Sequence, residues 1–388
     1  MGRLVEHGPD DFFDEKKDWS RVKHSILKKY LDIYTNIRGS KNPLLFFIDG
    51  FAGPGWYGSG DQREQGSPIL AAELAQRAIS EGKPYRLHCI LVEGDPDRAE
   101  QLAEAMSGFD RSLATVMPGP FSEWRPTILR QIGDHPALFF LDPWGVKGIE
   151  LSDIQSLLDR PDTELLIRLD AERLRRLAGN EDSAAPESVG KLRRVSLVVG
   201  EDPDDPEGGW LGQWRQLGSS LEWEEWAVAT YARRLRERSP HLQHAVPYPV
   251  RETYRSRPKY YLIFATRYPP AVGYMNEVVC IEDENLFSST EAVRGAQLSF
   301  LGDIHVQERE SRLRDLMEEI HQYGIAHQRV SRSDIMQHFA VRRFGQFMKK
   351  HYRQAIDALV AAGRARYDGR ANDKAPIIFL SSTRVDPS

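Results

Sequence analysis

The sequence has few cysteines and no long apolar run. Its 388 residues include two cysteines, Cys89 and Cys280, too few for a disulfide framework or a four-thiolate metal site. No apolar run approaches the ~18 residues that cross a bilayer, and the N-terminal residues lack the apolar core of a signal peptide. The 11 histidines show no convincing ligand spacing. We therefore expect a cytoplasmic protein with no membrane contact and no metal site.

An overall excess of basic charge is also absent. The chain carries 52 Lys and Arg against 57 Asp and Glu, a net charge of -5. The molecule as a whole is therefore not a basic protein of the kind that covers nucleic acid. Any contact with nucleic acid must therefore be local. The length suffices for one large domain plus a smaller one.

Short apolar runs alternate with helical stretches through the first half of the chain. Continuous apolar runs suit parallel strands that are buried on both faces, and strand–helix alternation predicts a doubly wound, Rossmann-like α/β sheet. The four runs are Leu44–Ile48, Leu87–Val92, Ala137–Leu141 and Leu165–Leu169. A poorly marked strand is predicted at Thr115–Met117. Two later strands, His244–Val250 and Tyr260–Thr266, predict an antiparallel finish to the sheet.

Changes in pattern along the chain suggest its domains. We predict an N-terminal arm over residues 1–20, a Rossmann-like domain over 21–300 that a helix at Val272–Val279 closes, and a C-terminal domain over 305–388. A helical insertion, residues 170–238, interrupts the Rossmann-like domain and could cover the carboxyl edge of the sheet. Its tryptophans are more simply interpreted as the core of the insertion; they are Trp210, Trp214, Trp223 and Trp226.

The C-terminal region has the pattern of a winged helix-turn-helix domain. Three helices are predicted at Val306–Tyr323, Ser333–Phe339 and Phe344–Ala362, and a β-hairpin follows them. Residues 329–370 hold ten Lys and Arg against three Asp and Glu, which is the expected footprint of phosphate contact. The candidate nucleic-acid-binding residues are Arg342, Arg343, Lys349, Lys350 and Arg353. The alternative is a protein-binding winged helix whose basic face is solvated.

A glycine-rich turn follows the first predicted strand. Glycines at such a turn tolerate positive φ and let backbone amides approach a ligand. A dinucleotide site would require a helix immediately after the turn to hold the diphosphate, whereas the next helix is predicted to begin only at Ser67. We therefore favour S-adenosylmethionine over a nicotinamide cofactor. The candidate cofactor-binding residues of the turn are Asp49, Gly50, Phe51, Ala52, Gly53 and Gly55.

Two further strand ends carry an acidic residue. Glu93 ends the second strand, where a carboxylate can accept hydrogen bonds from both ribose hydroxyls; the alternative is a solvated carboxylate. Asp142-Pro143-Trp144 follows the Ala137–Leu141 strand. The Asp142 carboxylate and the Pro143 carbonyl can accept both N–H bonds of a planar amine, and Trp144 can stack on its ring. A tight Asp-Pro turn with a core tryptophan is the alternative interpretation.

These motifs together resemble the three-Cys-motif partner protein (TcmP) family over roughly residues 20–300. The resemblance rests on Lys23-His24, the turn from Asp49 to Gly55, Gly66-Ser67-Pro68, Glu93, Asp142-Pro143-Trp144-Gly145 and Lys147-Gly148-Ile149. It implies a class I methyltransferase fold, and a partner protein that resembles radical-SAM enzymes and carries the three cysteines. Trp144 departs from the Asp-Pro-Pro-aromatic motif of amino-methyltransferases. An Asp-Pro-Phe-Gly version resembles tRNA guanine N2-methyltransferases, which favours RNA.

We therefore expect an S-adenosylmethionine-dependent methyltransferase that acts on an exocyclic amino group of a nucleobase, with RNA favoured over DNA. Asp142, Pro143 and Trp144 are the candidate catalytic residues. Because the base must leave its stack to reach them, a single strand or a flipped base is the expected substrate. The alternative is a non-catalytic, methyltransferase-like module that docks nucleic acid or the three-Cys-motif partner.

Overall fold

The computed structural model describes residues 18–58, 60, 63–180, 186–202, 209–253, 256–294 and 299–380, the side chains of 18–19, 186, 290–294 and 299–309 excepted. The chain divides into two compact units, Met1–Tyr268 and Pro269–Ser388. The predicted N-terminal arm lies outside the described residues as far as residue 17, and helix α2 begins at Asp18.

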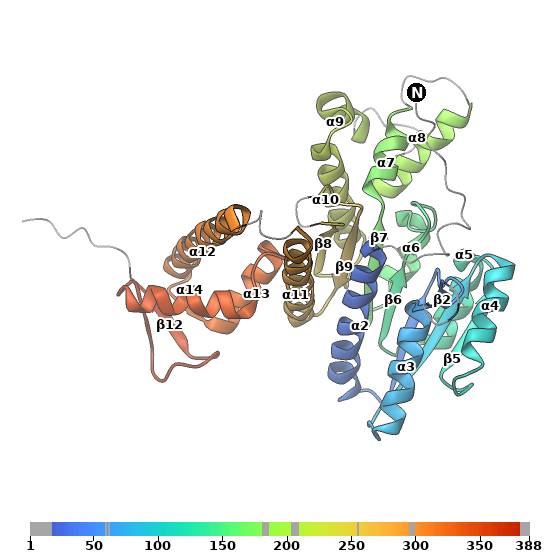
Figure 1. Ribbon diagram of the computed structural model, residues 1–388, viewed down its shortest axis with the longest axis horizontal. Coiled ribbons are helices and arrows are strands. Elements are labelled where there is room, and N and C mark those ends of the chain that lie inside the picture. The colour runs from blue at the N-terminus through green and yellow to red at the C-terminus, as the bar shows by residue number, and fades with distance from the viewer. Residues whose placement is uncertain are drawn as a thin grey trace, which may run out of the picture. The chain divides into compact units, whose positions relative to one another are not determined.

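The first unit is built on a seven-stranded sheet of order β5-β4-β1-β6-β7-β9-β8 (Figure 1). Its strands are β1 (Leu44–Asp49), β4 (Arg86–Glu93), β5 (Ala114–Pro118), β6 (Ala137–Leu141), β7 (Thr163–Leu169), β8 (His244–Val250) and β9 (Tyr260–Thr266). The first five pair in parallel, whereas β9 is antiparallel to both β7 and β8. The predicted Rossmann-like α/β sheet with an antiparallel finish is therefore confirmed.

Helices flank this sheet, and its central strands β1 and β6 are buried along almost their whole length. The flanking helices are α2 (Asp18–Gly39), α3 (Ser67–Ser80), α4 (Pro96–Met106), α5 (Phe121–Ile132) and α6 (Leu151–Leu158). A short hairpin of β2 (Trp56–Tyr57) and β3 (Glu64–Gln65) follows the glycine-rich turn. It was not predicted, because two-residue strands give no periodic signal. None of the helices in the described ranges is long and apolar enough for a membrane crossing.

The insertion after β7 is helical, as predicted, and Figure 1 shows α7 at the carboxyl end of β7. It consists of α7 (Ala171–Ala178), α8 (Pro186–Val199), α9 (Trp210–Leu217) and α10 (Leu221–Arg238). Trp223 lies at its centre, with its ring 5.2 Å from that of Trp214 and 6.4 Å from that of Trp210, both in edge-to-face contact. All three are buried, so the interpretation as core is confirmed for them. The fourth tryptophan, Trp226, is only partly buried and packs against the same core.

The second unit has its own helices, sheet and core. Its helices are α11 (Pro269–Arg294), α12 (Ser299–His327), α13 (Arg332–Arg342) and α14 (Lys349–Ala361), and its three-stranded sheet has the order β10 (Arg329–Ser331), β12 (Pro376–Phe379), β11 (Ala365–Tyr367). The three predicted helices and the predicted β-hairpin are therefore present, except that α14 begins at Lys349 instead of residue 344. Ile320, Phe339 and Ile356 are among its buried residues.

Helix α11 groups with the second unit. The side-chain amide of Asn276 donates to the Phe347 carbonyl at 2.7 Å and accepts from the Gly345 N–H at 2.8 Å. Asn276 is buried, so these bonds satisfy a polar group that would otherwise be costly. The helix predicted at Val272–Val279 therefore does not close the first domain, and the division between the units falls after Tyr268 instead of near residue 300.

Candidate active site

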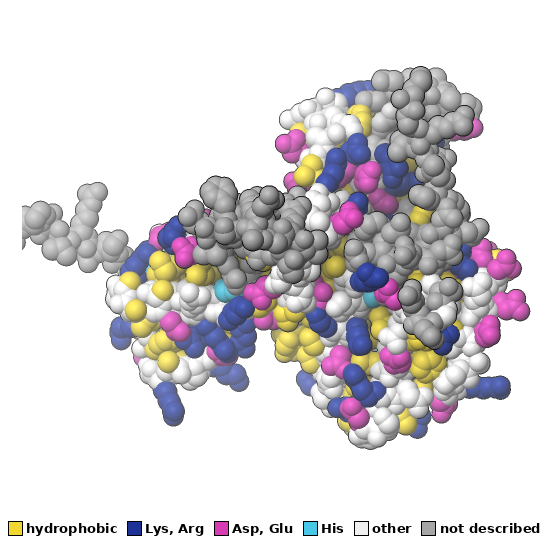
Figure 2. Space-filling view, viewed as in Figure 1, with side chains coloured by type: hydrophobic (Ala, Val, Ile, Leu, Met, Phe, Trp, Pro, Cys, Tyr) yellow, Lys and Arg dark blue, Asp and Glu magenta, His cyan; other side chains and the backbone are white. Residues whose placement is uncertain are grey.

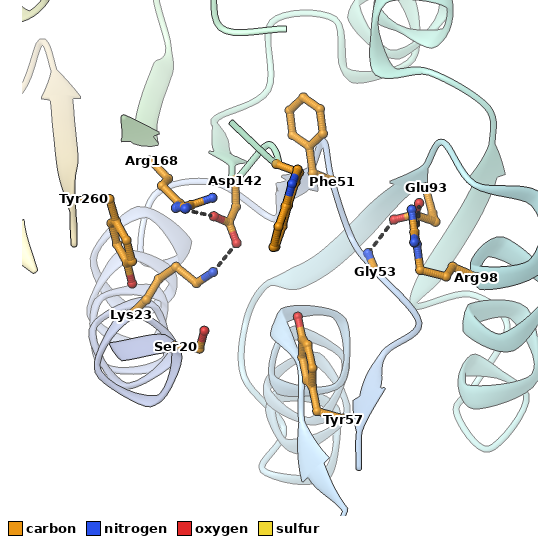
Figure 3. Close-up of a pocket in the computed structure, with 11 residues that line it drawn as sticks. Ser20, Lys23, Phe51, Gly53, Tyr57, Glu93, Arg98, Asp142, Arg168 and Tyr260 are labelled. Carbon is orange, nitrogen blue, oxygen red and sulfur yellow. Dashed lines mark hydrogen bonds and ion pairs between the residues drawn. The ribbon is translucent and has the colours of Figure 1, made fainter. Parts of the chain in front are cut away.

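Three acidic residues meet at the carboxyl edge of the sheet. Asp49 and Glu93 end β1 and β4, and Asp142 directly follows β6. Because β4, β1 and β6 are adjacent and parallel, their ends converge at one place, where α/β sheets bind ligands. A pocket with a cavity volume of about 120 Å³ opens there (Figure 3). It is lined by Ser20, Lys23, Phe51, Gly53, Tyr57, Glu93, Arg98, Asp142, Trp144, Arg168 and Tyr260.

One end of the pocket holds Asp142 between two basic side chains (Figure 3). The Lys23 ammonium donates to Asp142 Oδ2, and Arg168 Nε lies 3.7 Å from Asp142 Oδ1. Arg168 Nη1 also donates to the Pro143 carbonyl at 2.8 Å, and its guanidinium stacks over the Tyr260 ring at 4.8 Å. Asp142 Oδ1 is buried and has no hydrogen-bond partner among the described residues. Of the two predicted acceptor residues, Asp142 lines the pocket, whereas Pro143 is buried and does not line it. Protein cations already contact both of them.

The lysine at this end is buried, with its side chain 6% exposed. Burial lowers the pKa of Lys23 from its ordinary value, and Arg168 lowers it further, whereas Asp142 and Asp49 raise it. Lys23 was noted from the sequence only as part of a family motif. Its place on α2, far from Asp142 in sequence, gave no periodic or spacing signal.

The opposite end of the pocket is formed by Glu93 and Arg98 (Figure 3). Glu93 Oε2 accepts from the Gly53 N–H at 2.8 Å, and Oε1 accepts from the Asp95 N–H at 2.9 Å and from Arg98 Nε at 3.3 Å. The carboxylate is buried, so the alternative of a solvated carboxylate is wrong. Since each carboxylate oxygen has two acceptor positions, Oε2 can accept one more donor.

Asp49 lies beneath the pocket instead of lining it. Its side chain is fully buried. The Phe51 N–H donates to Oδ1 at 3.1 Å, while Oδ2 lacks a hydrogen bond of regular geometry. Burial raises the pKa of Asp49 to about 7, and the nearby Asp142 adds to this shift, although Ser67, Phe51 and Lys23 oppose it.

The amides of the glycine-rich turn bond within the protein, contrary to the expectation that they approach a ligand. The N–H groups of Gly50, Ala52 and Gly53 donate to Phe140, Val92 and Glu93 respectively. Only Phe51 and Gly53 of the turn line the pocket.

Gly50, Ala52 and Gly55 serve close packing instead. A Cβ on Gly50 would lie 2.8 Å from a Leu141 methyl, and Gly55 has φ +87° with Leu102 nearby. Ala52 is buried. None of the three lines the pocket, and their predicted contact with the cofactor stays a prediction.

Trp144 lines the pocket with its side chain 58% exposed. It is thus not a core tryptophan, because more than half of the residue faces solvent at the pocket. Six lining residues were not selected as site residues from the sequence: Ser20, Lys23, Tyr57, Arg98, Arg168 and Tyr260. Arg168 alone gave a signal, since it interrupts an otherwise apolar predicted strand. Within the described ranges, no group of three or more His, Cys, Asp or Glu side chains could hold a metal ion.

Four of the five basic candidates of the second unit lie near acidic partners. Arg343 pairs with Glu319, Lys350 with Glu284 at 3.1 Å, and both Lys349 and Arg353 with Asp373 at 3.3 and 2.9 Å. Arg342 is exposed. Figure 2 shows that Lys and Arg side chains gather on the surface of this unit. Exposed pairs of this kind contribute about 0–1 kcal/mol each, so an anionic ligand can replace them at little cost.

The sheet and its pocket define a Rossmann-like α/β protein with an acidic and basic site at the carboxyl edge. No protein-family model matches the chain, and no curated protein matches it either. The resemblance drawn from the sequence motifs therefore stays a prediction.

Proposed function

We propose that the first unit is an S-adenosylmethionine-dependent methyltransferase that acts on an exocyclic amino group of a nucleobase, with RNA favoured over DNA. One observation carries this proposal: a carboxylate at the end of β1 and another directly after the neighbouring β6 each have a buried oxygen that lacks a regular hydrogen bond, Asp49 Oδ2 and Asp142 Oδ1. A donor with regular geometry would gain a hydrogen bond there, although Arg168 lies 3.7 Å from Asp142 Oδ1 and Ser67 acts on Asp49. S-adenosylmethionine brings an ammonium and a sulfonium, and an amino acceptor brings N–H groups.

The residues at the pocket fit this ligand. Glu93 Oε2 can accept a ribose hydroxyl, and Phe51 and Gly53 line the same part of the wall. Asp49 lies behind that wall, where its negative charge favours a bound cation. When bound, S-adenosylmethionine supplies a methyl group on a cationic sulfur. The protein's contribution is then mainly orientation of donor and acceptor.

The acceptor would lie against Asp142, Pro143 and Trp144. Asp142 Oδ1 can accept one N–H of the amine, and the Pro143 carbonyl can accept the other because a carbonyl oxygen has two acceptor positions, of which Arg168 uses one. Trp144 is exposed enough to stack on the base. The reversed strand β9 between β7 and β8 also agrees with the methyltransferase-like fold that the sequence resembles.

Replacing Glu93 by glutamine is expected to weaken S-adenosylmethionine binding about 10- to 100-fold, because a hydrogen bond to a charged group contributes about 1.5–3 kcal/mol. Isothermal titration calorimetry measures this, with Glu100→Gln on the exposed face of α4 as the matched control. The cofactor assignment fails if the unaltered protein does not bind S-adenosylmethionine, or if Glu93→Gln binds it as tightly.

The ion pairs at Asp142 favour a second candidate function. Because Lys23 and Arg168 already contact the predicted acceptor groups, a non-catalytic module that binds nucleic acid or a three-Cys-motif partner is the alternative. Transfer of tritiated methyl groups to RNA, DNA or protein separates the two. Cofactor binding without transfer to any of these polymers would favour the alternative.

We further propose that the second unit is a winged helix-turn-helix that contacts the phosphates of the substrate. Helices α12, α13 and α14 precede the β11–β12 hairpin in the order that this motif requires. Its exposed cations pair with acidic neighbours only through surface contacts, which phosphates can replace.

Neutralising Arg342, Lys350 and Arg353 to glutamine is expected to reduce the slope of log K against log salt by about 2 for single-stranded RNA, since each phosphate contact adds about 0.7. Fluorescence anisotropy at several salt concentrations measures the slope. Lys83→Gln with Arg130→Gln, two exposed cations of the first unit, is the control. An unchanged slope in the triple variant would instead favour protein docking.

A further inference from the structure

Lys23 lies between carboxylates that come from two neighbouring strand ends. It contacts Asp142 after β6 directly, and Asp49 at the end of β1 is close enough to influence it. It also lines the pocket together with Phe51 and Gly53. A buried amine at this place faces any cation that the pocket receives.

The charges around Lys23 determine how easily its ammonium loses a proton when another cation binds in the pocket. Asp142 and Asp49 favour its ammonium form, and Arg168 on β7 opposes that form. The other lining residues near Lys23 are Ser20 on the same helix, Tyr57 and Tyr260, whose side chains are uncharged. Burial further disfavours the charged form. A second positive charge in this pocket would therefore act on a lysine that already loses its proton more easily than an exposed one.

We propose that Lys23 exchanges a proton during the transfer reaction. In the free protein it is an ammonium paired with Asp142. It releases its proton when a sulfonium binds, and it later takes up the proton that the acceptor nitrogen loses. This inference rests on the proposed function.

The exchange balances both atoms and charge. In transfer from S-adenosylmethionine, a C–N bond to the acceptor forms while the C–S bond breaks and its electron pair stays on sulfur. The acceptor nitrogen then carries one proton too many. Asp142 accepts that proton, and Lys23 Nζ takes it through the existing Lys23–Asp142 contact. The site has lost the sulfonium charge and gained the ammonium charge, so its net charge is unchanged.

The first test is proton release on binding, measured by calorimetry in buffers of different ionisation enthalpy. S-adenosylmethionine is expected to release a proton on binding. S-adenosylhomocysteine, which lacks the transferred methyl group and with it the sulfonium charge, is expected to release none. Binding of both ligands with equal proton release would overturn the inference but leave the proposed function standing. No binding of S-adenosylmethionine would overturn both.

Two variants of Lys23 test the residue itself. Arginine keeps the charge but cannot release its proton, so Lys23→Arg is expected to lose the proton release and to bind S-adenosylmethionine about tenfold or more weakly, with S-adenosylhomocysteine unaffected. Lys23→Met is neutral and is expected to bind both ligands without proton release. Transfer should fall about 100-fold or more in each, the usual contribution of a proton acceptor.

Lys28→Arg, on the exposed face of the same helix, is the matched control and should behave like the unaltered protein. Urea unfolding shows whether each variant is folded. Proton release that persists in folded Lys23→Arg, or an unchanged preference between the two ligands, would show that another group titrates and would overturn the inference.

Discussion

Asp49→Asn is expected to make the protein more stable at pH 8 and to weaken its binding of S-adenosylmethionine. Asp49 is fully buried, and burial raises its pKa from 3.8 to about 7. A raised pKa in the folded state means that the folded protein holds this proton more tightly than the unfolded chain does. The carboxyl group therefore contributes full stability below about pH 4, and this contribution is lost as the pH rises through 7.

The size of this loss follows from the pKa difference. One pKa unit corresponds to about 1.4 kcal/mol, so ionising Asp49 costs up to about 4 kcal/mol at pH 8. Asparagine resembles the protonated acid, and its carbonyl can still accept from the Phe51 N–H. The variant should thus match the unaltered protein at pH 4 and exceed it at pH 8. A buried carboxylate at a binding site that lowers the stability of the fold when it ionises is typical of a site where function is favoured over stability.

Urea unfolding at pH 4, 6 and 8 measures this difference, and calorimetry measures the cofactor affinity. Asp32→Asn is the control, because its carboxylate is exposed and pairs with Arg77 at the surface. It should change stability by less than about 1 kcal/mol at every pH. A destabilised Asp49→Asn at pH 8 would show that Asp49 is a structural anion with a partner in the folded protein.

The sheet was predictable because its strands are buried on both faces. A run such as Ala137–Leu141 is wholly apolar because β6 lies between β1 and β7 under helices on either side. The same reasoning placed Asp49, Glu93 and Asp142 at one edge, since parallel neighbours end together. The strand order β4-β1-β6, which the sequence did not give, makes these three strand ends neighbours.

The partners of these carboxylates were not predictable in the same way. Lys23 reaches Asp142 from α2 across more than 100 residues of sequence, and Arg168 and Tyr260 come from β7 and β9. No local pattern records such contacts, because they depend on the tertiary packing. The internal bonding of the turn amides is likewise a property of the folded turn, since Gly53 meets Glu93 only once β1 and β4 have paired.

Asp142→Asn is expected to destabilise the protein by about 3–5 kcal/mol and to abolish methyl transfer. Lys23 is buried and contacts Asp142, so loss of the carboxylate leaves an ammonium in the interior without its partner. Breaking a buried ion pair from one side has this cost because the remaining charge is neither hydrated nor paired.

The double variant Lys23→Met with Asp142→Asn is expected to recover most of this stability. Replacing both members of a buried pair by neutral groups is often neutral or even stabilising, although Arg168 keeps Asp170 at 3.5 Å as a partner. Urea unfolding of the two single variants and the double variant gives the coupling energy between the residues. Purely additive effects would mean that the contact carries no energetic coupling. A stable double variant without transfer activity would mean that the pair is kept for its chemistry, because the fold does not need it.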